Sequence, residues 1–224
     1  SKVGYYNDFK SRQETAIVAS DPVKANTPSE NMGRIMHLLD YKRLFAFSDT
    51  SEVVFKGIGE SGAISATDLP NPEKISENGI SKLRPLIVDK SVLYVQARGS
   101  IIRDMMAEIT LDSYPGDEIS LFSAHLVDNY ELTDWAFQKT PHPIVWIVRN
   151  DGVMLSITYN ATQQIKGFAR HDFFGGEVES VACVSEAQYD VLYAVVKRTI
   201  NGFTKRYIET IVTKEPVALV DKTF

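Results

Sequence analysis

Residues 144–159 read IVWIVRNDGVMLSITY, and this stretch decides the fold. An apolar run comes first, a polar turn ending in Asp151-Gly152 follows, and a second run rich in β-branched and aromatic residues closes the stretch. An Asp-Gly pair supplies the positive φ angles that tight hairpin turns require. Val, Ile, Trp and Tyr suit the pleated surface of a sheet. The stretch therefore predicts a β-hairpin.

The same pattern of strand, tight turn and strand recurs along the chain. The hairpins are expected at residues 44–55, 92–104, 144–159 and 191–208. Their first residues lie about 50 positions apart, and a repeat of that length with several strands per unit is typical of a β-propeller. Gly99 and the pair Asn201-Gly202 supply the turns of the second and fourth hairpins.

Further strands are expected on both sides of each hairpin. The preceding strands are expected at residues 34–39, 82–88, 131–137 and 179–184. The following strands are expected at residues 63–66, 118–122, 164–169 and 209–212. Prolines predict loops at residues 19–31 and 68–80.

Four antiparallel strands make one propeller blade. The sequence therefore predicts an all-β, propeller-like domain over residues 1–214, followed by a linker or tail at 215–224. The repeat gives about four blades, and a strand at residues 5–9 would belong to part of another.

Composition and charge exclude several classes of protein. The net charge is −5, with 24 basic against 29 acidic residues, which argues against a dedicated nucleic-acid binder. A channel through which DNA slides has a different requirement, because each neutralised phosphate adds affinity and would hold the DNA back. The single cysteine, Cys183, cannot form an internal disulfide. No apolar stretch approaches the roughly 18 residues of a membrane span.

The histidines provide the first candidates for chemistry. None of the four, His37, His125, His142 and His171, has the spacing of a helical metal site. His171 precedes Asp172, so the two could form half of a catalytic pair. Adjacent residues on an extended chain point to opposite sides, however, which favours a structural role for His171.

The other candidates favour structural roles as well. Cys183 lies in an apolar stretch, where a small buried hydrophobe is the ordinary case. The letters Gly57-x-Gly59-x-x-Gly62 match a nucleotide-binding pattern, but Pro70 and Pro72 follow where a helix would have to run. Asp104 and Glu108 would share a face only on a helix, and residues 101–104 are expected to be a strand. Core packing is the favoured role of three aromatic residues on expected strands: Trp135, Phe137 and Trp146. We expect no catalytic, cofactor-binding or metal-binding residues, and no cofactor.

Several blocks of the sequence resemble one known family. The blocks are residues 84–104, 134–136 with 144–153, 170–182, 198–202 and, in a diverged form, 3–9. In order and spacing they are similar to blocks of the tail tubular protein B group, which includes the nozzle and hub proteins of short-tailed bacteriophages. Members of that family are much longer, so the resemblance implies that the chain is an excerpt. They often carry Trp where Phe168 stands here.

The resemblance implies a structural and non-enzymatic function. It implies a virion protein made in the host cytoplasm and assembled, at full length, into a homo-hexameric ring below the portal that extends the DNA exit channel. The implied partners are the adaptor or head–tail connector, the needle or fibre, and genomic DNA passing without sequence-specific binding. Two alternatives stay open: a tail-associated propeller that hydrolyses host surface glycan, and one that binds a host receptor or glycan.

Overall fold

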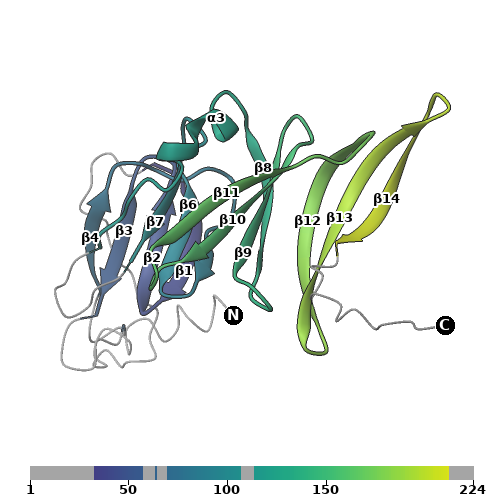
Figure 1. Ribbon diagram of the computed structural model, residues 1–224. Coiled ribbons are helices and arrows are strands. Elements are labelled where there is room, and N and C mark those ends of the chain that lie inside the picture. Colours follow the sequence, from purple (N-terminus) through teal and green to yellow (C-terminus); the bar gives the residue numbers. More distant parts are fainter. Residues whose placement is uncertain (1–32, 58–63, 65–69, 107–113, 212–224) are drawn as a thin grey trace, which may run out of the picture. The chain divides into compact units, whose positions relative to one another are not determined.

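The computed structural model describes residues 33–57, 64, 70–106 and 114–211. Most residues of this part lie in β-strands, so the protein is all-β, as predicted (Figure 1). The chain divides into two compact units, Ser1–Gly79 and Ile80–Phe224. Among the described residues, no helix is long and apolar enough to cross a membrane. The expected strand at residues 5–9, the loop at 19–31 and the tail at 215–224 lie outside the described residues.

The described residues of the first unit form one four-stranded antiparallel sheet. Its strands follow chain order and are β1 (Ile35–Tyr41), β2 (Arg43–Ser48), β3 (Glu52–Lys56) and β4 (Asn71–Ser76). Phe45 and Phe47 on β2 are buried, as are Val53 and Val54 on β3. The hairpin expected at residues 44–55 is therefore confirmed as β2–β3.

The loop expected at residues 68–80 is wrong in part, because β4 lies within it. Pro72 suggested a break, but an edge strand tolerates a residue that lacks an N–H group. Pro72 stands opposite Phe55 on the outer strand of the sheet. The buried carboxylate of Glu52 fixes the end of β4 by accepting hydrogen bonds from the Ser76 hydroxyl and the Asn78 N–H. Of the strand expected at 63–66, only residue 64 is described, and it is not in a strand.

The second unit contains three antiparallel sheets, whose strands again follow chain order. The first sheet comprises β5 (Leu86–Val88), β6 (Ser91–Val95) and β7 (Ile102–Met105). The second comprises β8 (Leu132–Gln138), β9 (Ile144–Arg149), β10 (Met154–Asn160) and β11 (Ile165–His171). The third comprises β12 (Gly176–Glu186), β13 (Tyr189–Ile200) and β14 (Phe203–Ile211). The three remaining hairpins are thereby confirmed, as are the preceding strands expected at residues 34–39, 131–137 and 179–184. Of the preceding strand expected at 82–88, only residues 86–88 form a strand, which is β5.

Two of the expected following strands are wrong. Residues 118–122 contain only an isolated bridge at Glu118, after which come the 3₁₀ turn η2 (Leu121–Ser123) and the short helix α3 (Ala124–Val127). The Ser120 hydroxyl accepts a hydrogen bond from the Ile102 N–H, at 3.1 Å, and so takes a place that a strand backbone would otherwise fill. Residues 209–211 belong to β14 itself and form no separate strand, and residue 212 lies outside the described residues. The strand expected at 164–169 is confirmed as β11.

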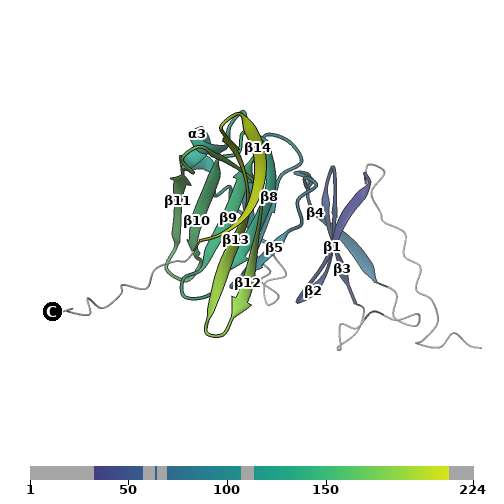
Figure 2. The same cartoon turned by 90° about the vertical axis from the view of Figure 1, so that its right-hand side faces the viewer.

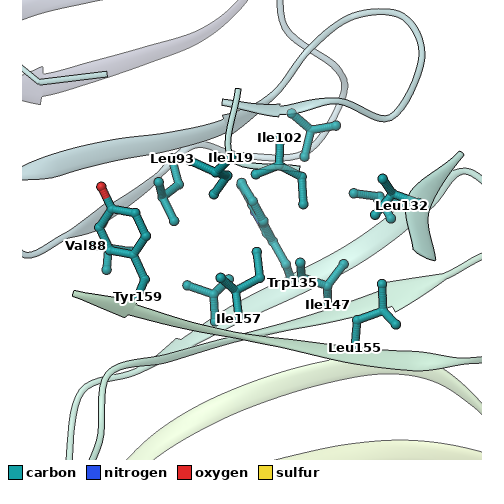
Figure 3. Packing of buried hydrophobic residues seen from close by; sticks show 13 residues of the cluster. Val88, Leu93, Ile102, Ile119, Leu132, Trp135, Ile147, Leu155, Ile157 and Tyr159 are labelled. Atoms are coloured by element: carbon teal, nitrogen blue, oxygen red, sulfur yellow. The ribbon is translucent and has the colours of Figure 1, made fainter. Parts of the chain in front are cut away.

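The middle sheet of this unit is buried on both faces. On β9 and β10, Val145, Ile147 and Leu155 face the β5–β7 sheet, whereas Trp146 and Met154 face β12 and β13. Figure 3 shows the first of these clusters, with the Trp135 ring at its centre. Figure 2 shows the β12–β14 sheet in front of β8 and β9, and β12 contacts both of these strands. Consecutive sheets therefore pack face to face, and β8–β11 is the layer between the other two.

Two hairpin turns use positive φ angles in different ways. Asn201 and Gly202 both have positive φ, 51° and 79°, which corresponds to a two-residue type I′ loop. In the turn after β9 only Gly152 has positive φ, at 80°, and a Cβ there would lie 2.6 Å from the Glu177 Cβ. A Cβ on Gly202 would meet nothing within 4 Å. A substitution at Gly202 therefore causes backbone strain alone, whereas one at Gly152 causes both backbone strain and a steric clash.

We expect Gly152→Ala to destabilise the protein more than Gly202→Ala. Both substitutions place an alanine at positive φ, which costs about 1 kcal/mol. Gly152→Ala also forces a shift against the backbone of β12, at a further cost of roughly 1–3 kcal/mol. Urea unfolding of the two variants measures the difference, and equal losses of stability would contradict the close approach of Gly152 to Glu177.

Candidate functional site

A buried polar cluster joins the first two sheets of the second unit. The phenol oxygen of Tyr159, on β10, lies 2.9 Å from the Ser91 Oγ and 2.9 Å from the Asp104 Oδ2. The phenol has one proton and a carboxylate can only accept, so Tyr159 donates to Asp104 and receives from Ser91. Burial, the largest cause, raises the pKa of Tyr159 well above its usual range. The phenol therefore stays protonated and acts as a fixed donor.

The Asp104 carboxylate collects three donors. Lys166 Nζ lies 2.9 Å from Oδ2, and the Asp117 N–H donates to Oδ1 at 2.9 Å. Asp104 is 7% exposed, and a buried carboxylate without these donors would be strongly destabilising. The cluster draws one residue each from β6, β7, β10 and β11. It therefore locks the two sheets in one register across their interface.

Two pockets open beside Tyr159. One, of about 560 Å³, is lined on its apolar side by Ile87, Phe137 and Pro143 and on its polar side by Asp89 and Asn160. The other, of about 400 Å³, is lined by Asp104, Asp117, Gln164 and Lys166 among others. The polar groups of the second pocket are largely the donors and acceptors of the buried cluster. The first pocket combines an aromatic ring with amide and carboxylate groups, which suits a small polar ligand.

His171, singled out from the sequence, contacts a serine across the sheet. Its Nε2 lies 2.8 Å from the Ser156 Oγ, and its ring centroid lies 5.1 Å from that of Trp146. The contact is diagonal, because His171 stands opposite Met154 and Ser156 opposite Ala169. Burial, the largest cause, lowers the pKa of His171, and the charge of Asp172 opposes that shift. The imidazole is therefore neutral at pH 7.

The Ser156–His171 contact can exchange one proton between a hydroxyl and an imidazole. A nucleophilic serine also needs a group that orients the base. Asp172 is held instead by Arg170, whose Nε donates to Oδ1 at 2.9 Å. Ser156 is 7% exposed and faces Trp146 under the third sheet. The geometry supports a hydrogen bond that fastens β11 to β10.

The remaining sequence candidates occupy separate places. Cys183 is half-buried on β12, and burial raises the pKa of its thiol to about 12, so the reactive thiolate is not formed near neutral pH. His37 lies on β1, His125 on α3 and His142 in the loop before β9. In the described ranges no group of His, Cys, Asp and Glu is arranged to hold a metal ion. Glu108 and most of the Gly57–Gly62 motif lie outside those ranges.

The tryptophans pack in the core, as predicted. Trp135 donates its indole N–H to the Arg84 carbonyl at 2.7 Å, and Trp146 donates to the fully buried Gln138 Oε1 at 3.0 Å. Phe168 packs against the first cluster. Phe137 packs there too and also lines the larger pocket, so core packing is only half of its role.

Several large apolar side chains of the third sheet and of the residues just before it are exposed. Val184, Ile208 and Phe203 are 46%, 76% and 72% exposed, and Phe174, just before β12, is fully exposed. By the strand register, Val184 and Ile208 lie on the face that points away from β8–β11, whereas Phe203 lies on the other face, at the end of the hairpin. Ion pairs lie on both faces: Lys197 with Glu177, Arg198 with Glu209, and Arg206 with Glu179. Exposed apolar side chains among charged groups are found at protein contact surfaces.

Comparison with models of known protein families and with curated proteins gives no match.

Sequence reasoning missed the buried cluster and the Ser156–His171 contact. Their members stand far apart in the chain: Ser91 and Tyr159 are separated by 68 residues. The sequence signals were a tyrosine and an aspartate within otherwise apolar strands. Such signals show that a polar group needs a partner but do not say which partner it has.

We expect Tyr159→Phe to lower the free energy of unfolding by about 1–2 kcal/mol, because a buried carboxylate loses one donor. Tyr193→Phe is the matched control, since the Tyr193 hydroxyl contacts Glu186 on the exposed surface. This control should leave the stability unchanged. Denaturant unfolding measures both, and an unchanged Tyr159→Phe protein would show that the cluster does not hold the sheets.

The lowered pKa of His171 predicts a pH-dependent stability. The unfolded imidazole binds a proton near pH 6.5, whereas the folded one binds it only at lower pH. Above about pH 6.5, His171 therefore does not lower the free energy of unfolding, and below that value its protonation in the unfolded chain makes this free energy fall. We expect His171→Asn to reduce this loss and the exposed His125→Asn to leave it unchanged, as measured by urea unfolding between pH 7.5 and 5. Identical pH profiles for wild type and His171→Asn would contradict the burial of the imidazole.

Proposed function

We propose that the chain is a structural, non-enzymatic component of a short bacteriophage tail, part of the hub or nozzle through which the genome leaves. The observation that carries the proposal is the open outer sheet. The β8–β11 sheet is covered on both faces by its neighbours, whereas β12–β14 leaves Val184, Phe203 and Ile208 exposed. Apolar surface of this kind suits a subunit whose remaining contacts are made by other chains. The sequence blocks, above all residues 84–104 and 134–153, support the identity of the assembly.

The finer fold that goes with this function is a β-propeller. All four sheets are antiparallel meanders whose strands follow chain order, as they do in a blade. In the second unit each sheet packs its face on the next, which is the way blades contact one another. These two features support a propeller, with the sheets of three strands as reduced blades.

The net charge of the chain suits a channel through which DNA passes better than a site that binds DNA tightly. A net charge of −5 gives weak attraction for phosphates, and three basic side chains of β12–β14, Lys197, Arg198 and Arg206, are paired with glutamates. The proposed partners are further copies in a homo-hexameric ring, the adaptor or head–tail connector, and the needle or fibre. DNA would pass without sequence-specific contacts, and the proposed location is the tail of the virion.

A second candidate function is glycan binding on the tail. The pocket of about 560 Å³ favours it, because Phe137 offers an aromatic face beside Asp89 and Asn160. Sugars are held by such combinations of ring stacking and hydrogen bonds. Hydrolysis would also need two carboxyl groups at a defined separation, and among the described residues Asp89 is the one carboxylate that lines this pocket.

Electron microscopy of labelled virions tests the proposed function. An affinity tag inserted in the exposed turn between Ala187 and Gln188, in the full-length protein of the source phage, can be labelled with gold beads. We expect labels at the tail of each particle, none on the head, and rings of six copies for the purified full-length protein. A turn insertion of this kind is well tolerated, and untagged particles are the control.

Two results would reject the proposal. One is tagged, infectious virions that carry no label at the tail, with the protein recovered as a monomer. The other is release of sugar from host polysaccharide by the purified protein, which would establish an enzyme. Saturable binding of polysaccharide without release, abolished by Phe137→Ala, would favour the second candidate function instead.

A further inference from the structure

Strand β14 forms one edge of the third sheet. Among the described strands it pairs only with β13, in nine residues and without a register shift. The two-residue loop makes Ile200 and Phe203 a hydrogen-bonded pair, and such pairs alternate along an antiparallel ladder. The N–H and C=O groups of the even-numbered residues therefore point away from β13. These residues are Thr204, Arg206, Ile208 and Thr210.

Most of the other sheet edges carry a feature that discourages pairing with another chain. A register shift interrupts the ladders of β1, β4, β8 and β12, and Pro72 lies on β4. Strands β5 and β7 have only three and four residues. Strand β11 has seven residues, with Gly167 and two cationic side chains among them. Such features usually protect an edge strand from pairing with another chain. Strand β14, in contrast, has the longest uninterrupted ladder of these edges and exposes Phe203 and Ile208.

The sequence of β14, FTKRYIETI, is complementary to itself when two copies run antiparallel. Centred on Tyr207, the pairing sets Phe203 opposite Ile211 and Thr204 opposite Thr210. It also sets Lys205 opposite Glu209 and Arg206 opposite Ile208, and by symmetry each of these pairs occurs twice. Opposite charges and apolar pairs directly across an antiparallel ladder are stabilising.

We propose that β14 pairs with β14 of a second copy of this chain and joins two β12–β14 sheets into one continuous sheet. The outward-pointing backbone groups of the even-numbered residues meet one another in this register. Tyr207 faces its own counterpart at a non-hydrogen-bonded position, where the two Cα atoms lie about 4.5 Å apart.

Neighbouring registers fit less well. A shift by one residue brings outward-pointing backbone groups against inward-pointing ones. A shift by two in one direction sets Arg206 opposite Arg206, a like-charge pair. A shift by two in the other direction replaces both Lys205–Glu209 pairs and leaves Phe203 without a counterpart. The register centred on Tyr207 alone uses all nine residues.

This contact is independent of the proposed function. It uses the same surface on both copies and therefore closes at two, whereas a ring needs two different surfaces. Absence of a ring would leave the strand pairing in place, and absence of strand pairing would leave the ring in place.

A charge exchange tests the pairing in the full 224-residue chain. Lys205→Glu sets two carboxylates opposite each other twice, so we expect the dimer dissociation constant to rise about tenfold or more. The double variant Lys205→Glu/Glu209→Lys restores opposite charges and should return the constant to within about threefold of wild type. Folding is protected in the double variant, because Arg198, which now holds Glu209, stands opposite position 205 and can take the new carboxylate there. Sedimentation velocity over a concentration series measures the constant.

Cross-linking tests the register itself. In a Cys183→Ala background, Tyr207→Cys places two thiols at a separation that a disulfide can bridge. Thr204→Cys is the matched control: it faces Thr210, and its own counterpart lies about 20 Å away along the strand. We expect mild oxidation to give a covalent dimer with Tyr207→Cys and not with Thr204→Cys. A wild-type chain that stays monomeric at all concentrations, or equal cross-linking by both variants, would overturn the proposal. So would a dimer that Lys205→Glu leaves unchanged.

Discussion

The second unit depends on the burial of one sheet from both sides. Strands β9 and β10 carry large apolar side chains on both faces, so both faces must be removed from water. The β5–β7 sheet covers one face and β12–β13 the other. At roughly 25 cal/mol for each Å² of buried apolar surface, this stacking is the main favourable contribution to the unit. The polar groups inside it then have to be satisfied locally, since water does not reach them.

That constraint explains the form of the buried cluster. Tyr159 continues the apolar run of β10 toward the β5–β7 sheet, and its hydroxyl arrives between two apolar layers. A phenol there needs partners, and Ser91 and Asp104 provide them from the opposite sheet. Asp104 in turn needs more than a phenol, and Lys166 reaches it from β11. Stacking supplies the free energy of association, whereas the cluster selects one register from those that stacking alone would permit.

The sequence predicted what depends on local chemistry. The four hairpins follow from strand-forming runs and turn residues that are neighbours in the chain, and each of them is present. The role of a residue such as Pro72 depends instead on whether its strand is at an edge, which the local sequence does not say. The side chain of Ser120 likewise accepts a hydrogen bond from Ile102, a residue 18 positions away, in place of a strand backbone. The conformation at both positions depends on tertiary contacts. The local sequence pattern does not contain these contacts, and it therefore predicted a loop at residue 72 and a strand at residue 120.

In the candidate site, too, the sequence predicted the features that depend on local chemistry and missed those that depend on strand pairing. The sequence placed Trp135 and Trp146 in the core and judged His171 by Asp172, its neighbour in the chain. The contact that holds His171 comes from Ser156 on the adjacent strand, through a diagonal that exists only after β10 and β11 pair. That diagonal draws the imidazole toward Trp146 and away from solvent, which lowers its pKa and keeps it neutral. His171, the strongest candidate for chemistry in the sequence, is thus part of the packing. The surface that remains exposed is that of the β12–β14 sheet. Among the described residues, stacking is complete for β8–β11 but one-sided for β12–β14, so the third sheet keeps a face on which a further protein surface can pack.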